Sequence, residues 1–307
     1  MHAKIILSSV SFDDSFITRV YTDPAPTLAA YDSLWKEEVF TLISDWHKYS
    51  GAPFDHASIK NQLRTLIDQN EAERADHPVA KLRDRIMARA PAFQVEVFPR
   101  IASLLPPETP IEATATLVAL IVPGAFCAAG RVVVNLSHPQ LLEAGEDLIL
   151  NIVAHELYHI GFHSHQDHGS EASPDATPRE LADHVLWWLQ NEGMATYASY
   201  NVTDIYPVHG AAPDYTMLEN PADVRRFTAN VNEILAATST LPRDALKEPL
   251  WTKGVKERAF YVVGAHMART IDREKGRETL ITLIHEGPRS YAEAYNTLAP
   301  RDMTVNL

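Results

Sequence analysis

The stretch NIVAHELYHIGFHSH, residues 151 to 165, places two histidines and a glutamate in a segment that is otherwise largely apolar. His155 and His159 are four residues apart, so on a helix both imidazoles lie on one face, about one turn apart. Side chains so placed can bind one metal ion, and Glu156 beside the first histidine can accept a proton from water at that ion. The spacing therefore predicts metal-assisted hydrolysis. The alternative is that the histidines are core residues held by hydrogen bonds.

A catalytic zinc ion needs a third protein ligand and an open fourth position. One candidate for the third ligand is His165, which completes the spacing H-E-x-x-H-x-x-F-x-x-H. This is the histidine spacing of the metzincin peptidases, whose chain turns sharply at a glycine where this sequence has Phe162. A bulky residue is unfavourable in the left-handed conformation that such a turn requires. His165 is therefore the less favoured of two candidates.

The favoured third ligand is Glu192, in a segment from 178 to 202 that has the pattern of a helix. The apolar face of this helix is formed by Leu181, Val185, Trp188 and Leu189. Glu192 continues that stripe, and a carboxylate on a buried face needs a cation, which a zinc ion would supply. A helix cap or a salt bridge is the alternative explanation for this glutamate.

The segment WWLQNEGMATY, residues 187 to 197, resembles the part of the gluzincin metallopeptidases, including the aminopeptidase N type, that delivers the glutamate ligand. Together with HELYH it resembles the peptidase MA clan. The chain is most similar to a family of zinc-dependent peptidases known mainly as a domain of unknown function, over about residues 115 to 295. The resemblance implies that His155, His159 and Glu192 bind Zn²⁺ and that Glu156 is the general base.

The sequence departs from the aminopeptidases in two ways. The interval between His159 and Glu192 is longer, and the extra length is a polar stretch from 164 to 177. We expect this stretch to be a loop at the mouth of the site that gates substrate entry. The Gly-x-Met-Glu-Asn motif of the exopeptidases is absent upstream of HELYH, so recognition of a free peptide N-terminus is not supported.

A tyrosine on a later helix is a candidate for stabilising the oxyanion of the reaction. The segment ERAFYVVGAHMARTI resembles the Tyr-x-x-Gly helix of this clan, which makes Tyr261 the candidate donor. Tyr261 could equally be a core aromatic residue. His266 is a weaker alternative donor, and a core histidine is the favoured explanation for it.

Other polar residues near these motifs have less specific interpretations. GRVVVNL, residues 130 to 136, is predicted to be an edge strand along which an extended peptide pairs. Asn135 could point at substrate, although a strand-end cap explains it better. The histidines that follow HELYH are expected to be solvated loop residues, with a second, adventitious metal as the alternative; they are His163, His165 and His168.

The predicted elements give an α+β fold that is mostly helical, with a small sheet. Helices are predicted at 25–51, 57–69, 78–89, 151–162, 178–202, 221–237, 254–270 and 277–297, and strands at 114–122 and 130–136. The helix at 178 begins with a capping box, in which Thr177 is the N-cap and Glu180 the third helical residue. We expect residues 1–105 to form a helical scaffold subdomain and residues 106–307 a gluzincin-like metallopeptidase domain.

Composition narrows the possible partners and compartments. The 307-residue chain has a formal net charge of -13, which argues against nucleic acid and against an acidic membrane surface. No run of residues is long and apolar enough for a membrane-spanning helix. The single cysteine, Cys127, excludes an intramolecular disulfide and is expected to be buried and inert. The protein is expected in the cytoplasm if residue 1 is the native start, and outside it if a signal peptide preceded that residue.

These observations predict a zinc-dependent hydrolase, and in particular a peptidase acting on a peptide or protein substrate. The alternative is a non-catalytic binding or scaffold protein that uses zinc for structure. A structural site is closed by a fourth protein ligand, which the sequence does not obviously offer. Glu156 also favours catalysis, since metal ligation does not need it.

Overall fold

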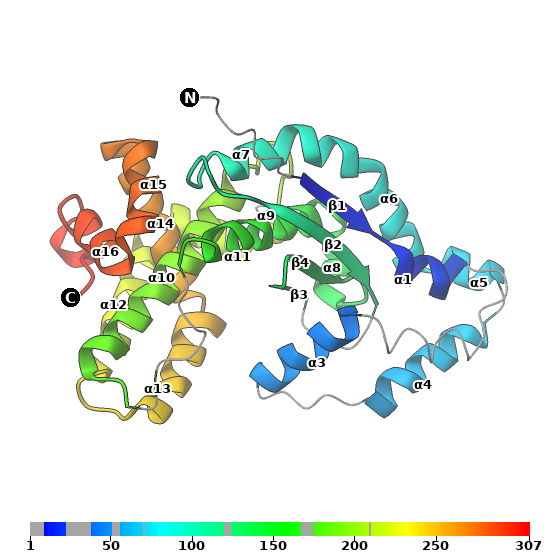
Figure 1. Ribbon diagram of the computed structural model, residues 1–307, viewed down its shortest axis with the longest axis horizontal. Helices are drawn as coiled ribbons and strands as arrows, with labels where there is room; N and C mark the ends of the chain where they lie inside the picture. Colours follow the sequence, from blue (N-terminus) through cyan, green and yellow to red (C-terminus); the bar gives the residue numbers. More distant parts are fainter. Residues whose placement is uncertain are drawn as a thin grey trace. The chain divides into compact units, whose positions relative to one another are not determined.

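The computed structural model describes residues 9–22, 38–50, 56–69, 71–119, 124–166, 173, 175–208 and 210–307. The chain forms two compact units (Figure 1). Unit 1 contains residues 99–110 and 158–307, and unit 2 contains the described residues within 7–98 and 111–157. The division falls inside one continuous helix, α9 (Glu146–His163).

Unit 2 is built on a four-stranded mixed sheet with the strand order β1-β2-β4-β3. Its strands are β1 (Ser9–Asp13), β2 (Glu112–Val118), β3 (Ala125–Ala128) and β4 (Arg131–Asn135). β1, β2 and β4 are parallel, and β3 runs antiparallel to β4. Figure 1 shows β1 and β2 side by side although about a hundred residues separate them in the sequence.

The sheet corrects two expectations. The segment 130–136 forms β4 as predicted, but β4 lies between β2 and β3 and is not an edge strand. The sheet edge next to β4 is β3, which lies in the segment between the two predicted strands. β3 and β4 form a hairpin through Ala129 and Gly130, whose φ angles are 48° and 72°. Two consecutive positive φ angles are the signature of a type I′ turn, which alanine rarely adopts. Residues 120–122 of the other predicted strand lie outside the described residues.

Along the sequence of unit 2, the helices lie between and after the strands. They are α1 (Ser15–Ile17), η1 (Thr18–Thr22), α3 (Glu38–Ser50), α4 (His56–Ile67), α5 (Glu71–Asp76), α6 (Pro78–Ala92), η2 (Phe93–Val97), α7 (Phe98–Ala102), which crosses into unit 1, and α8 (Pro139–Ala144). The predicted helices at 57–69 and 78–89 are confirmed by α4 and α6. The second half of the helix predicted at 25–51 is confirmed by α3. Its first half, residues 25–37, lies outside the described residues.

The N-terminal end of α9 is held by charge. Glu146 and Asp147 occupy its first turn, where negative side chains interact favourably with the helix dipole. On α6, Arg85 pairs with Glu146 at 2.8 Å, and Arg89 pairs with Asp147. The rest of the helix is apolar enough to be buried on most sides. This end of the helix is therefore fixed by unit 2.

The centre of unit 1 is α10 (Pro178–Tyr200), whose residues from 189 to 199 are all buried. The predicted capping box is present: the Thr177 hydroxyl accepts from the Glu180 N–H, and the Glu180 carboxylate accepts from the Thr177 N–H. The most extensive contacts of α10 are with α14 (Ala259–Lys275). The remaining helices of the unit are α11 (Pro213–Glu219), α12 (Pro221–Ala237), α13 (Arg243–Pro249), η3 (Leu250–Lys256), α15 (Arg277–Glu286), α16 (Pro288–Asn296) and η4 (Arg301–Met303).

Two predicted helices of unit 1 have different boundaries in the structure. The segment 254–270 begins in η3, and α14 starts at Ala259 and runs to Lys275. The segment 277–297 is two helices, because Gly287 has a φ of 92° and ends α15 before Pro288 starts α16. The helix at 221–237 is confirmed by α12.

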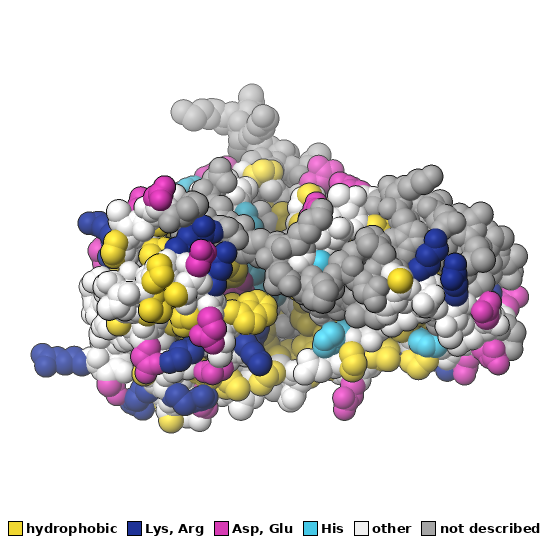
Figure 2. All heavy atoms as spheres, turned by 90° about the horizontal axis from the view of Figure 1, so that it is seen from below, with side chains coloured by type: hydrophobic (Ala, Val, Ile, Leu, Met, Phe, Trp, Pro, Cys, Tyr) yellow, Lys and Arg dark blue, Asp and Glu magenta, His cyan; other side chains and the backbone are white. Residues whose placement is uncertain are grey.

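The overall class agrees with the prediction, since the chain is mostly helical with one small sheet. The boundary at residue 105 stays a prediction, although the first segment also supplies β1, which the sequence did not indicate. Cys127 is partly exposed on β3 rather than buried. No helix among the described residues is long and apolar enough to cross a membrane. Figure 2 shows acidic and basic side chains interspersed on the face it presents, without one large patch of either sign.

Candidate metal centre

His155, His159 and Glu192 come together in the folded chain. The ligand atoms of these three side chains all lie within 4.8 Å of one another. The two histidines are one turn apart on α9, and Glu192 comes from α10. His159 and Glu192 are 5% and 7% exposed, whereas His155 is partly exposed. The group therefore has a buried side and a side that is open to solvent.

Asn191 orients the second histidine. Its Oδ1 lies 2.9 Å from His159 Nδ1 and 3.0 Å from His163 Nε2. An amide oxygen only accepts hydrogen bonds, so each of these ring nitrogens carries the proton. The lone pair of His159 is then on Nε2, the atom that lies 3.5 Å from Glu192 Oε2. Metal-binding histidines are typically held by an acceptor in this way.

The separation of His159 Nε2 and Glu192 Oε2 fits a metal better than a direct hydrogen bond. At 3.5 Å the two atoms are farther apart than the roughly 2.7–3.2 Å of a good N–H···O bond. Bonds of about 2.0–2.1 Å to a tetrahedral zinc ion would place two ligand atoms about 3.4 Å apart. Two imidazoles and one carboxylate are also a known ligand set for catalytic zinc. The donor chemistry and the spacing therefore fit zinc.

The glutamate that is predicted to activate water is the next residue in the chain after His155. Glu156 follows His155 on α9 and is partly exposed, in contrast to the buried Glu192. The two carboxylates thus differ in environment, and that of Glu156 is accessible to water.

A close crossing of two helices sets the position of Glu192. A Cβ on Gly193 would lie 2.2 Å from the Cα of Gly264, and a Cβ on Gly264 would lie 2.1 Å from the carbonyl oxygen of Leu189. Only glycine allows the backbones of α10 and α14 to approach this closely. Tyr291 strengthens the crossing by donating from its hydroxyl to the Gly264 carbonyl oxygen at 2.6 Å.

Tyr261 lies on the face of α14 that approaches α10. It precedes Gly264 by three residues, and residues at this spacing share one face of a helix. Gly264 contacts Gly193, the neighbour of Glu192, so Tyr261 is about one helical turn from the crossing that holds the glutamate. Its side chain is 9% exposed. The role of Tyr261 as an oxyanion donor stays a prediction.

Arg258 is a residue at this site that the sequence did not indicate. It precedes α14 with a φ of 71°, and a left-handed arginine stores about 1–2 kcal/mol of strain. Its guanidinium lies over the Tyr261 ring at 3.2 Å from the centroid and binds both carboxylate oxygens of the buried Asp214.

The charge of Arg258 interacts with the Glu192 carboxylate of the metal group. Burial works to lower the pKa of Arg258, but its negative and polar neighbours raise the pKa above the ordinary value. The neighbours responsible are Tyr261, Asp214 and Glu192. Arg258 therefore holds the Tyr261 ring and adds positive charge near the Glu192 carboxylate. No spacing rule could have found it, because the left-handed position normally favours glycine or asparagine.

The remaining candidates have other contacts. His266 packs edge-on against Tyr295 of α16, and burial lowers the pKa of His266 to about 4. Asn135 is a strand-end cap, since its Oδ1 accepts from the N–H and hydroxyl of Ser137. His163 lies in the last turn of α9 rather than in the loop, and its ring stacks between His159 and Trp187.

His165 is not part of the His155 group. α9 continues through His163, so Phe162 is helical and fully buried and no sharp turn occurs there. His165 instead forms a second group with Glu108 and His285. His168 lies outside the described residues, as does half of the predicted gate, at positions 167–172 and 174.

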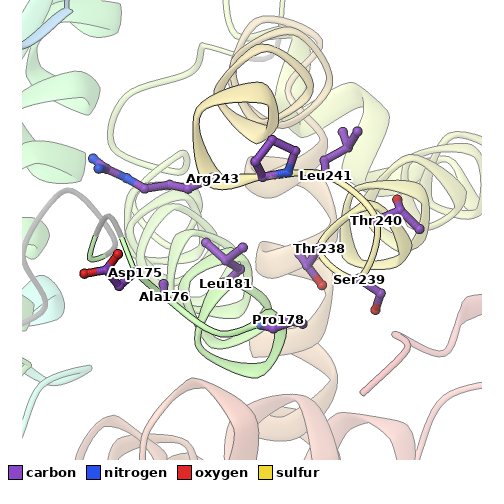
Figure 3. A pocket seen from close by; sticks show the side chains of 10 residues that line it. Asp175, Ala176, Pro178, Leu181, Thr238, Ser239, Thr240, Leu241 and Arg243 are labelled. Atoms are coloured by element: carbon purple, nitrogen blue, oxygen red, sulfur yellow. The ribbon is translucent and has the colours of Figure 1, made fainter.

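A hollow of about 480 Å³ lies at the start of α10 rather than at the metal group. Figure 3 shows Leu181 between Asp175 and the segment from Thr238 to Arg243. Leu181 precedes Glu192 by eleven residues, or about 16 Å along the helix axis. This hollow is therefore not the place where the candidate chemistry occurs.

Comparison with known proteins gives one match. The family model described as Putative zinc dependent peptidase (DUF5700) matches residues 56–304, which is more than half of the chain. The chain belongs to this family. The matched range includes α9, α10 and α14 and starts within the first 105 residues. Neither a curated protein nor a solved structure matches the chain. The family is described as zinc dependent, and the described residues include groups that could hold the ion.

Proposed function

We propose that this protein is a zinc metallopeptidase of the gluzincin type, which hydrolyses peptide bonds in peptide or protein substrates. The observation that carries the proposal is the convergence of His155, His159 and Glu192, with Glu156 next to His155 in the chain. Family membership supports the coarser statement of a zinc-dependent peptidase. The two histidines and Glu192 are proposed to hold the ion, and the open side of the group is left for water and substrate.

Each residue of the site has a separate proposed role. Zinc, when bound, supplies Lewis-acid chemistry that makes water nucleophilic near neutral pH. Glu156 accepts the proton of that water and later returns it to the leaving amine. The Tyr261 hydroxyl donates to the oxygen that becomes negative on the scissile carbonyl. Arg258 keeps the Tyr261 ring in place and favours negative charge nearby.

The test of this function is the variant Glu156→Gln, which keeps the size of the side chain but cannot accept a proton. Purified wild type and variant are incubated with a mixed peptide library, and cleavage is followed by mass spectrometry. We expect unchanged zinc content and melting temperature, with activity lower by about two to four orders of magnitude because general-base catalysis is lost.

The control is Glu143→Gln, the same change at an exposed glutamate of α8. It should cleave the library at the wild-type rate. Wild-type cleavage by Glu156→Gln would refute the proposed mechanism. A wild-type protein that binds zinc but cleaves no library peptide would support the alternative, a non-catalytic zinc protein.

A further inference from the structure

A second group of possible metal ligands lies in unit 1, apart from the proposed catalytic residues. Glu108 comes from the turn before β2, His165 follows α9, and His285 lies in the last turn of α15, orange in Figure 1. Their ligand atoms all lie within 4.8 Å of one another. The two imidazole rings are 4.9 Å apart between centroids and nearly perpendicular.

The backbone around this group is held by buried hydrogen bonds. Gln166, next to His165, is 6% exposed. Its amide nitrogen donates to the Ile284 carbonyl oxygen at 2.6 Å and to Gln190 Oε1 at 3.1 Å. Gln190 in turn donates to the carbonyl oxygen of Leu283 at 2.9 Å. Gln166 and Ile284 are thus joined by a hydrogen bond, which places their chain neighbours His165 and His285 side by side.

The buried Thr109 determines which nitrogen of His165 can bind a metal. The Thr109 hydroxyl donates its one proton to the Pro106 carbonyl oxygen at 2.6 Å. The same oxygen lies 2.6 Å from His165 Nε2 and can therefore only accept there. Nε2 carries the ring proton, and the lone pair of His165 is on Nδ1. An acceptor behind a histidine is the arrangement that accompanies metal ligation.

The contact between the other two residues also suits a metal. His285 Nε2 and Glu108 Oε1 are 3.5 Å apart, beyond the roughly 3.2 Å limit of a good hydrogen bond and near the roughly 3.4 Å edge of a tetrahedral zinc site. Two imidazoles and one carboxylate favour zinc and similar transition metals over calcium or magnesium, which prefer oxygen ligands. The side chains of His285 and Glu108 are 48% and 61% exposed, so water can fill the remaining position.

We infer that Glu108, His165 and His285 form a second zinc site, which binds more weakly than the buried group and cross-links three segments of unit 1. The ion would join the turn at 106–109, the segment that leaves α9 and the end of α15. Because it binds only the folded chain, zinc at this site stabilises unit 1 by mass action. A hundredfold excess of zinc over the dissociation constant should raise the melting temperature by about 5 °C.

The test uses the full chain, stripped of metal and titrated with Zn²⁺ in a calorimeter. We expect two zinc ions per chain for the wild type and one for His285→Asn or Glu108→Gln, without the second rise in melting temperature. The matched control is His184→Asn, a histidine on α10 outside both groups, which should keep both ions.

A second background separates this site from the proposed catalytic site. His159→Ala removes a ligand of the first group and should retain one zinc ion, which the double variant with His285→Asn loses. Co²⁺ in place of Zn²⁺ gives visible absorption that reports the same loss. The inference is overturned if His159→Ala binds no zinc, or if His285→Asn binds as much zinc as His184→Asn. Neither result depends on whether the protein cleaves peptides.

Discussion

Substitution of Gly193 by alanine tests whether the helix crossing positions the metal group. The added Cβ would lie 2.2 Å from Gly264 Cα and 2.8 Å from Ala265 N, where ordinary contacts begin at 3.4 Å. Because the obstructing atoms are backbone, α10 and α14 must separate by about 1 Å or more. Overpacking of this kind typically costs about 1–3 kcal/mol, and alanine recovers up to about 1 kcal/mol of helix propensity.

We therefore expect Gly193→Ala to lose about 1–2 kcal/mol of folding free energy, or roughly 2–8 °C in melting temperature. A shift of about 1 Å between Glu192 and Tyr261 should also lower peptidase activity by about 100-fold. Thermal unfolding, zinc content and library cleavage are measured on one preparation. The control is Gly210→Ala, where a Cβ meets nothing within 4 Å, and its effect should stay within about 0.5 kcal/mol. If the two variants are equally stable and active, the crossing does not position the site.

Two further predictions follow from contacts of single residues. Asn191→Ala removes the hydrogen-bond acceptor of His159 Nδ1 and should weaken zinc binding about 10- to 100-fold in a chelator competition assay. Asn191→Asp keeps an acceptor at this position and should bind zinc at least as tightly as the wild type. The pKa of His266 is about 4 in the folded chain, against an ordinary value of 6.5. Burial lowers this pKa most, the positive charges of Arg269 and Arg273 lower it further, and the negative charge of Glu219 opposes them. As the pH falls from 6.5 to 4, His266 takes up a proton in the unfolded chain but not in the folded chain. The free energy of unfolding therefore decreases over this pH range, by about 1–3 kcal/mol once the partial exposure of His266 is taken into account. Urea unfolding of His266→Gln, beside the wild type, should show a shallower loss of stability over this pH range; equal slopes would contradict the assignment.

Features encoded by local chemistry were predictable from the sequence. The spacing of His155 and His159 requires only a helix to bring the imidazoles to one face. The start of α10 is specified by Thr177 and Glu180, whose side chains complete their own hydrogen bonds. Glu192 could be selected because it continues an apolar stripe, and the structure places it beside His159.

Features that depend on distant segments were not predictable. β1 is parallel to a strand about a hundred residues away, and no short-range pattern reports such pairing. The place of β4 inside the sheet depends on β3, whose hairpin uses an unusual alanine, Ala129, at positive φ. Arg258 likewise adopts its left-handed conformation because Asp214, from another helix, binds it. The break at Gly287 is different, since a Gly-Pro pair is a local signal that the helical periodicity concealed.

Anomalous diffraction at the zinc absorption edge, from crystals of the wild-type protein grown with Zn²⁺, tests the central claim most directly. We predict an anomalous peak about 2.0–2.2 Å from nitrogen atoms of His155 and His159 and from a carboxylate oxygen of Glu192. That peak should be stronger than any peak at His165 and His285. No peak between the first three residues, or a peak there with His165 in the place of Glu192, would contradict it.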